Sequence, residues 1–260
     1  MSARARSAGY VPSLDLSCLQ VHYQPQVSVR SGRVVAVEAL LCYDDPLYGR
    51  IDTREVLRGA EQAAMLEEVT TDLLTQALTQ AGAWRSRDAR HLHISINLAG
   101  MQLRDRHLST RIADALAGCA VPPLLLELEI SELEASMLAS PSLEALRALG
   151  VHLTIDDFSG TRVTPSVLKG CGATALKIDT AVIDAIGEDP DGEVTARAII
   201  DAAHELGLTV TAEGVETTDQ FAFLEAHGCD GVQGYLMSRP LDADALGRFL
   251  RSHGDRPASG

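Results

Sequence analysis

Short apolar runs rich in β-branched residues alternate with longer segments of helical periodicity along almost the whole chain. Several helical segments are followed by a glycine of the kind that stops a helix, at Gly118, Gly150, Gly207 and Gly228. This repetition of strand, helix and glycine is typical of a parallel sheet with right-handed crossovers. The expected strands cover residues 34–40, 93–98, 124–130, 152–158, 175–179, 208–215 and 231–235, and the expected helices cover 56–84, 108–118, 142–150, 192–207, 217–228 and 242–254.

The first unit differs from the others, because residues 19–43 read as two strands joined by a glycine-containing turn at residues 30–33. A sheet that begins with such a hairpin contains at least one antiparallel strand. With about seven or eight strand–helix units, closure into an α/β barrel is favoured over an open doubly wound sheet. No GxGxxG or GxxxxGK[ST] motif follows the first strand, which argues against Rossmann and P-loop folds.

The length of 260 residues suits a single barrel domain. We expect this domain at residues 19–252, between an N-terminal tail or linker remnant at 1–18 and a disordered C-terminal tail at 253–260. The sequence contains neither a membrane-spanning apolar stretch nor a secretory signal. Five cysteines without CxxC spacing favour reduced thiols in a cytoplasm over a zinc cage or a disulfide framework.

The net charge of −14 argues against a general nucleic-acid surface, because binding a phosphate backbone requires stripes of lysine and arginine. A small phosphate ligand held through metal ions remains compatible with such an acidic protein.

Polar residues close several of the expected strands. Because buried carboxylates are costly unless a cation meets them, their repetition at strand ends indicates a divalent-metal site at one mouth of a barrel. Oxygen ligands without histidine or cysteine select hard cations such as Mg²⁺ or Mn²⁺. The acidic and amide positions are Glu38, Asn97, Glu129, Asp156, Asp157 and Glu213, and Lys177 and Gln233 close two further runs.

Eight short motifs in order resemble the EAL-domain family of bacterial cyclic-di-GMP phosphodiesterases, from about Leu19 to Leu250. They are YQP (23–25), EAL (38–40), INL (96–98), ELEISE (127–132), DDF (156–158), LKID (176–179), AEGVET (212–217) and QGYLMSRP (233–240). The resemblance implies a modified (β/α)8, TIM-like barrel with its substrate across the C-terminal face of the sheet. It also implies hydrolysis of cyclic-di-GMP to linear pGpG, with two Mg²⁺ or Mn²⁺ ions supplying hydroxide and neutralising phosphate charge.

The resemblance further implies a role for each matching residue. One metal ion would be held by Glu38, Asn97, Glu129 and Asp156, and Asp156 would bridge to a second ion held by Asp157 and Glu213. Lys177 would orient or help deprotonate the attacking water, with Gln233 nearby, and Glu38 and Glu213 would join it in catalysis. Substrate contacts would come from Gln24, Leu40, position 42 and Gln233, while Glu132 and Glu216 would support the site from behind.

The sequence departs from the family pattern at two places. Cys42 stands where the family usually has an arginine that contacts a substrate phosphate, and loss of such a contact costs about 1.5–3 kcal/mol. Arg50 or Arg162 is a candidate to compensate. After the aspartate pair, residues 159–165 replace a two-glycine loop by one with a single glycine and Pro165, which changes the path of the chain.

Two functions therefore stay open. Retention of every ligand position favours an active phosphodiesterase, whereas Cys42 and the altered loop favour a degenerate module that binds cyclic-di-GMP or a protein partner without turnover. We expect cyclic-di-GMP as ligand, a homodimer, and a regulatory domain or protein partner.

Overall fold

A computed structural model describes residues 18–45, 49–51, 53–62, 64–85, 89, 91–100, 102–135, 141–163 and 165–254. The expected tails at 1–18 and 253–260 lie almost entirely outside the described residues. Among the described helices, none combines the length and apolar character needed to cross a membrane.

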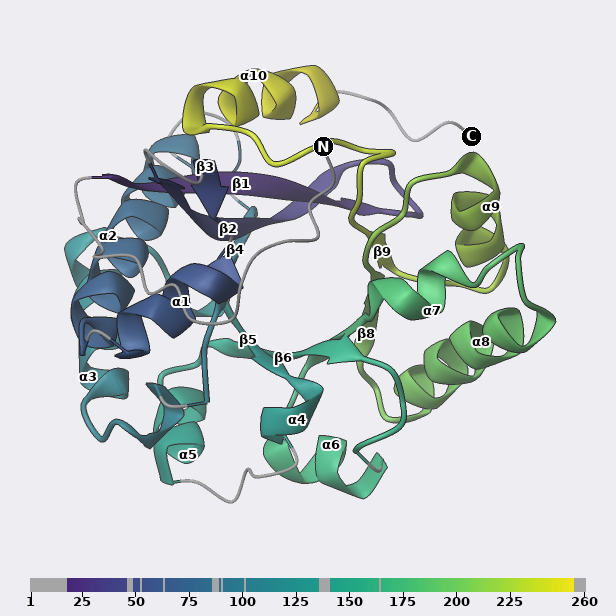
Figure 1. The fold of residues 1–260 in the computed structure, drawn as a ribbon, viewed down its shortest axis with the longest axis horizontal. Helices are drawn as coiled ribbons and strands as arrows, with labels where there is room; N and C mark the ends of the chain where they lie inside the picture. The colour runs from purple at the N-terminus through teal and green to yellow at the C-terminus, as the bar shows by residue number, and fades with distance from the viewer. Residues whose placement is uncertain are drawn as a thin grey trace.

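The strands form a closed barrel in the order β1, β9, β8, β7, β6, β5, β4, β2, closed by pairing of β1 with β2. Strand β1 is antiparallel to both of its neighbours, and the other barrel strands run parallel. This confirms the expected TIM-like barrel with an antiparallel first strand (Figure 1). The strands are β1 (Leu19–Ser28), β2 (Val34–Asp45), β4 (His93–Asn97), β5 (Leu126–Ser131), β6 (His152–Phe158), β7 (Ala175–Ile178), β8 (Thr209–Ala212) and β9 (Gly231–Val232), with β3 (Gly49–Ile51) added antiparallel to the end of β2.

The expected hairpin between β1 and β2 is confirmed. Gly32 adopts a φ of 65°, in the left-handed region that glycine enters at little cost, and its N–H donates to the Ser28 carbonyl at 2.8 Å. The turn thus reverses the chain and fixes the pairing register that places Gln24 opposite Glu38.

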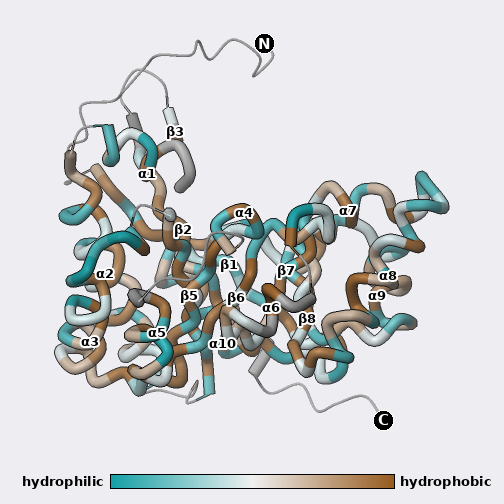
Figure 2. Tube along the Cα trace, turned by 90° about the horizontal axis from the view of Figure 1, so that it is seen from below, coloured by the Kyte–Doolittle hydropathy of each residue, from teal (hydrophilic) through white to brown (hydrophobic). Residues whose placement is uncertain are grey.

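Helices surround the barrel and bury apolar faces against it (Figure 1). Three short or early helices, α1, α4 and α7, lie on one side of the structure in Figure 2. Helices α4 and α7 directly follow the C-terminal ends of β5 and β7, so this side is the C-terminal mouth of the barrel. The helices are α1 (Thr53–Gln62), α2 (Leu66–Arg85), α3 (Leu108–Gly118), α4 (Glu132–Ala135), α5 (Pro141–Ala148), α6 (Pro165–Cys171), α7 (Thr180–Asp184), α8 (Pro190–Glu205), α9 (Thr218–Ala226) and α10 (Ala243–Gly254).

Two local expectations are wrong. The single helix expected over 56–84 is two helices, because Ala64 adopts a left-handed φ of 57° that ends α1 before α2 begins. Gly118 is the last residue of α3 rather than its left-handed stop, and Ala120 takes that conformation with a φ of 51°. The other expected stops are confirmed, with φ of 82° at Gly150, 75° at Gly207 and 76° at Gly228.

Candidate metal centre at the C-terminal mouth

Lys177, at the end of β7, is the centre of the polar mouth. Its side chain is only 2% exposed, and it faces four carboxylates contributed by four other strands or strand ends. Its Nζ lies 2.5 Å from Glu213, 3.0 Å from both Glu38 and Glu129, and 3.7 Å from Asp156. One ammonium group therefore meets four carboxylates, which leaves a surplus of negative charge in a buried place.

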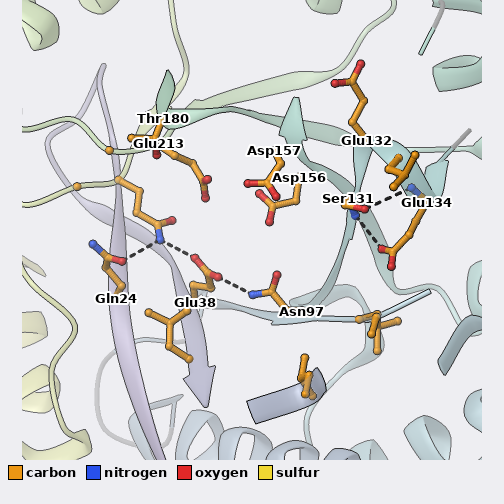
Figure 3. Close-up of a pocket in the computed structure, with 18 of the residues that line it drawn as sticks. Gln24, Glu38, Asn97, Ser131, Glu132, Glu134, Asp156, Asp157, Thr180 and Glu213 are labelled. Carbon is orange, nitrogen blue, oxygen red and sulfur yellow. Dashed lines mark hydrogen bonds between the residues drawn. The ribbon is translucent and has the colours of Figure 1, made fainter. Parts of the chain in front are cut away.

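Glu38, in β2, is held by donors on three sides. The amide of Asn97 donates to its Oε1 at 2.6 Å, while Gln233 and Lys177 donate to its Oε2 at 2.6 and 3.0 Å. Gln233 also donates to Gln24 at 3.2 Å, so the hairpin strand β1 is tied into the same network (Figure 3). These contacts fix the orientation of the Glu38 carboxylate.

Asp156 and Asp157 are consecutive residues of β6, yet both carboxylates face the cavity in Figure 3. In a regular strand, successive side chains point to opposite faces. Here the pairing of β6 with β7 shifts register between Ile155 and Phe158, and Asp157 has a φ of 51°. The bulge and the left-handed residue turn Asp157 towards the site, where oxygens of Asp156, Asp157 and Glu213 all lie within 4.8 Å of one another.

The crowding of charge shifts the pKa of the carboxyl groups in different directions. Burial and the charges of Glu38 and neighbouring carboxylates raise the pKa of Glu129 and of Asp156. Burial, together with Asp156 and Glu38, raises the pKa of Glu213 to about 8 despite the contact with Lys177.

Burial also opposes ionisation of Glu38, but the Lys177 charge and the donated hydrogen bonds outweigh it and lower its pKa. Burial likewise opposes the charge of Lys177, yet Glu129, Glu213 and Glu38 raise its pKa well above the ordinary value.

The donor set fits hard divalent cations. Oε1 of Glu129 and Oδ1 of Asp156 are buried acceptors that receive no hydrogen bond from the described residues. Unpaired buried acceptors are rare, and here they occur beside carboxylates whose ionisation is unfavourable. Cations bound among these oxygens would satisfy both the orphaned acceptors and the surplus charge, and the purely oxygen chemistry suits Mg²⁺ or Mn²⁺.

A pocket of about 920 Å³ opens above this network. Gln24, Leu40 and Gln233, three of the expected substrate contacts, line it. Cys42 does not: its side chain is buried, with Sγ 3.8 Å from Nδ1 of His22. The exposed residue Glu216 also lines the pocket.

Glu132 anchors the altered loop that follows β6. Its carboxylate accepts hydrogen bonds from the backbone N–H groups of Ser159 (3.0 Å), Arg162 (2.8 Å) and Val163 (3.1 Å), and from the Ser159 hydroxyl (2.9 Å). Burial opposes its charge, but these hydrogen bonds lower its pKa. Residues 159–163 are thus fixed by a buried carboxylate, and Pro165 begins α6.

Some pocket residues lie outside the motifs, and Arg58 on α1 is one of them. It lines the pocket together with Arg162 and Tyr235, so two of the described arginines reach the pocket. The Arg50 side chain lies outside the described residues. Gly214, with a φ of 69°, allows a close approach of Thr180, since a Cβ there would lie 2.4 Å from its methyl group. The glycine after Glu213 could have indicated that approach.

The fold and site define a class of protein: a barrel with a lysine and several carboxylates at the C-terminal ends of its strands. The family model described as EAL domain matches residues 12–240. The chain belongs to the EAL domain family.

Curated relatives and solved structures support membership of this family. The chain is 34% identical over 237 residues to the bifunctional diguanylate cyclase/cyclic di-GMP phosphodiesterase MucR of Pseudomonas aeruginosa, covering 90% of this chain and 35% of the relative. It is 35% identical over 240 residues to the cyclic di-GMP phosphodiesterase NbdA of the same species, covering 90% and 30%. The chain therefore spans about a third of the length of these curated relatives.

Among solved structures, the PaMucR phosphodiesterase in its c-di-GMP complex superposes with a TM-score of 0.84 at 33% identity, covering 89% of this chain and 95% of that one. The EAL domain of Mycobacterium smegmatis DcpA gives 0.75 at 28% identity, covering 90% and 98%.

Proposed function

We propose that this EAL domain hydrolyses cyclic-di-GMP to linear pGpG in a reaction that depends on two Mg²⁺ or Mn²⁺ ions. The observation that carries the proposal is the position of Lys177 Nζ, which lies 2.5–3.7 Å from four carboxylates beneath an open pocket. The relatives whose names record cyclic di-GMP phosphodiesterase activity support the choice of substrate.

In this proposal, one ion would be held by Glu38, Asn97, Glu129 and Asp156, and a second would be held by Asp156, Asp157 and Glu213. Such a pair of ions supplies a hydroxide at neutral pH and neutralises charge on the phosphate. The clustering of Asp156, Asp157 and Glu213 within 4.8 Å supports the second group of ligands.

Lys177 then acts on the attacking water through Nζ. The four carboxylates hold the proton on Lys177 by raising its pKa. Neutralisation of those carboxylates weakens this field, so that Nζ can orient the water and exchange a proton with it near neutral pH. Glu38 and Glu213, which contact Nζ directly, position that ammonium group.

Gln24, Leu40 and Gln233 contact the substrate from the pocket wall. Arg58 and Arg162 are the cations that line the same pocket, and we assign to them the phosphate contact that Cys42 cannot make. In this proposal, Glu132 and Glu216 support the site without contacting the metal ions. Glu132 does so by holding the loop at 159–163.

The second candidate is a module that binds cyclic-di-GMP or a protein partner without turnover. The burial of Cys42 away from the pocket lining favours it, because no guanidinium extends from that strand position. The four hydrogen bonds from the altered loop to Glu132 weigh against it, because they keep that loop fixed beside the site.

A homodimer, a regulatory domain or protein partner, and a cytoplasmic location belong to the same proposal. The curated relatives are about three times longer than the matched region, which supports a regulatory partner. All five cysteines are free thiols, as a reducing compartment would keep them.

Calorimetric titration with cyclic-di-GMP, run beside a turnover assay in Mg²⁺ or Mn²⁺, separates the two candidates. Binding with formation of pGpG supports the phosphodiesterase. Binding in both metals without any product supports the binding module, and absence of both leaves only the protein-partner role.

A further inference from the structure

A second pocket lies at the opposite end of the barrel from the metal-ligand cluster. Its volume is about 910 Å³, close to that of the first, and the two share no lining residue. Val34 begins β2 and Leu92 directly precedes β4, so the pocket lies at the N-terminal ends of these strands. The end of α2 and one side of α10 form its other walls.

The pocket is basic in an acidic protein. Arg33, Arg248 and Arg251 line it, whereas Asp244 is the one carboxylate among its described lining residues. Within the described part of the chain, none of these three guanidinium groups has an ion pair or a hydrogen bond. Three unpaired guanidinium groups around one cavity favour an anion, and guanidinium groups match phosphate geometry well.

A neutral donor, the indole N–H of Trp84, lines the same cavity. Trp84 is 5% exposed and packs edge-on against Tyr23, with ring centroids 4.7 Å apart. Its indole N–H makes no hydrogen bond within the described residues. A Cβ placed on Gly247 would lie 3.6 Å from Nε1 of Trp84 and 3.7 Å from Nη1 of Arg251. The Trp84 and Arg251 donors thus lie close to the backbone of Gly247, whose missing side chain leaves room for a ligand atom.

The remaining lining residues indicate what else the ligand carries. Val35, Leu92 and Leu250 give the pocket apolar walls beside its arginines. Its volume falls in the range of small-molecule sites and exceeds the needs of a lone phosphate ion. We propose that this pocket binds a nucleoside monophosphate, with its phosphate at Arg248, Arg251 and the Trp84 N–H and its sugar and base against the apolar walls.

Trp84 is the only tryptophan of the chain, so its fluorescence reports on this pocket directly. We suggest titrating the full chain separately with GMP, AMP and inorganic phosphate at constant ionic strength. The proposal predicts a saturable change in Trp84 fluorescence with both nucleotides, and binding of inorganic phosphate that is weaker by about tenfold or more, because the apolar walls remain unused.

Two variants test the location. Arg251→Gln should weaken nucleotide binding by about tenfold or more through loss of a charge-assisted contact, and Gly247→Leu should abolish it by filling the cavity. Arg197→Gln, an exposed arginine on α8 outside the pocket, is the matched control and should bind like the unaltered chain. Should Gly247→Leu fail to fold, Arg251→Gln still decides, because Arg251 is exposed and unpaired.

Absence of a saturable change at millimolar nucleotide would overturn the proposal. So would an equal affinity in Arg251→Gln and Arg197→Gln, which would place the nucleotide elsewhere on the protein. If chloride at the same ionic strength produced the same change in Trp84 fluorescence, the change would reflect charge screening, and this result would also overturn the proposal.

Discussion

Oε1 of Glu213 lies 2.5 Å from Nζ of Lys177, and the pKa of Glu213 is nevertheless raised to about 8. A single ion pair would lower the pKa of a carboxyl group. Here burial is the largest influence, and the nearby charges of Asp156 and Glu38 add to it, so Lys177 cannot neutralise the whole cluster. The metal-free site is therefore short of positive charge.

Binding of Mg²⁺ should release protons at pH 7. Glu213 ionises only near pH 8 in the metal-free protein, so a bound cation displaces its proton. Because the folded pKa exceeds the unfolded value near 4.5, the folded state binds more protons, and this group makes the metal-free protein less stable as pH rises from about 4.5 to 8. Calorimetry in two buffers of different ionisation enthalpy measures the protons released, and identical heats in both buffers would contradict the prediction.

Replacing the ammonium group of Lys177 should destabilise the metal-free protein. Lys177→Met leaves the four carboxylates around Nζ, two of them buried and two partly buried, without their shared cation. We expect this to lower the free energy of unfolding by about 3–5 kcal/mol. The loss should be larger at pH 8 than at pH 5, because the carboxyl groups can take up protons at the lower pH. Thermal melts at both pH values, with and without Mg²⁺, measure this. A loss that is independent of pH and of Mg²⁺ would indicate a packing role for Lys177.

Two ligand substitutions should affect metal-free stability in opposite directions. Asp156→Asn removes a charge that the fold disfavours, since the pKa of Asp156 is raised, and should keep or increase the melting temperature. Glu38→Gln removes a charge that three donors stabilise and should lower the free energy of unfolding by about 1–3 kcal/mol. Both should lose turnover by roughly a hundredfold or more.

Asp201→Asn, on the exposed side of α8, is the control for charge removal and should change neither stability nor turnover. If Asp156→Asn proved the less stable of the two ligand variants, the electrostatic account of the site would be wrong.

Cys42→Arg should tighten cyclic-di-GMP binding by about tenfold if position 42 lacks only its phosphate contact. The effect should appear in KM rather than kcat, because a contact made equally in ground and transition states is uniform binding. If KM stays unchanged while Arg58→Gln or Arg162→Gln raises it, these pocket arginines already supply the contact.

The location of the site could be predicted from the sequence, because the C-terminal ends of parallel barrel strands all lie at one mouth of the barrel. Carboxylates closing separate runs, such as Glu38 and Glu129, therefore had to meet there. The orientation of the aspartate pair could not be predicted, because two consecutive aspartates do not indicate a bulge. Asp157 takes its left-handed φ where the pairing of β6 with β7 shifts register. The division into α1 and α2 at Ala64 could not be predicted either, because alanine favours helices and the apolar periodicity continues across this position.

Arg58 could not be found from any motif, because its place on the pocket wall depends on how α1 packs beside β2. Likewise, the sequence around Cys42 predicts that it lies in a strand but not what surrounds its side chain. The structure shows this side chain buried beside His22.

The most direct test of the central claim is chromatographic analysis of cyclic-di-GMP incubated with the protein in Mg²⁺, Mn²⁺, Ca²⁺ or EDTA. We predict pGpG with Mg²⁺ or Mn²⁺, none in EDTA, and inhibition by Ca²⁺, whose looser coordination misplaces the attacking water. Asp156→Asn should form no product under conditions where Asp201→Asn matches the unaltered chain. Product formed at the same rate in EDTA, or by Asp156→Asn, would contradict a metal-dependent reaction at this site.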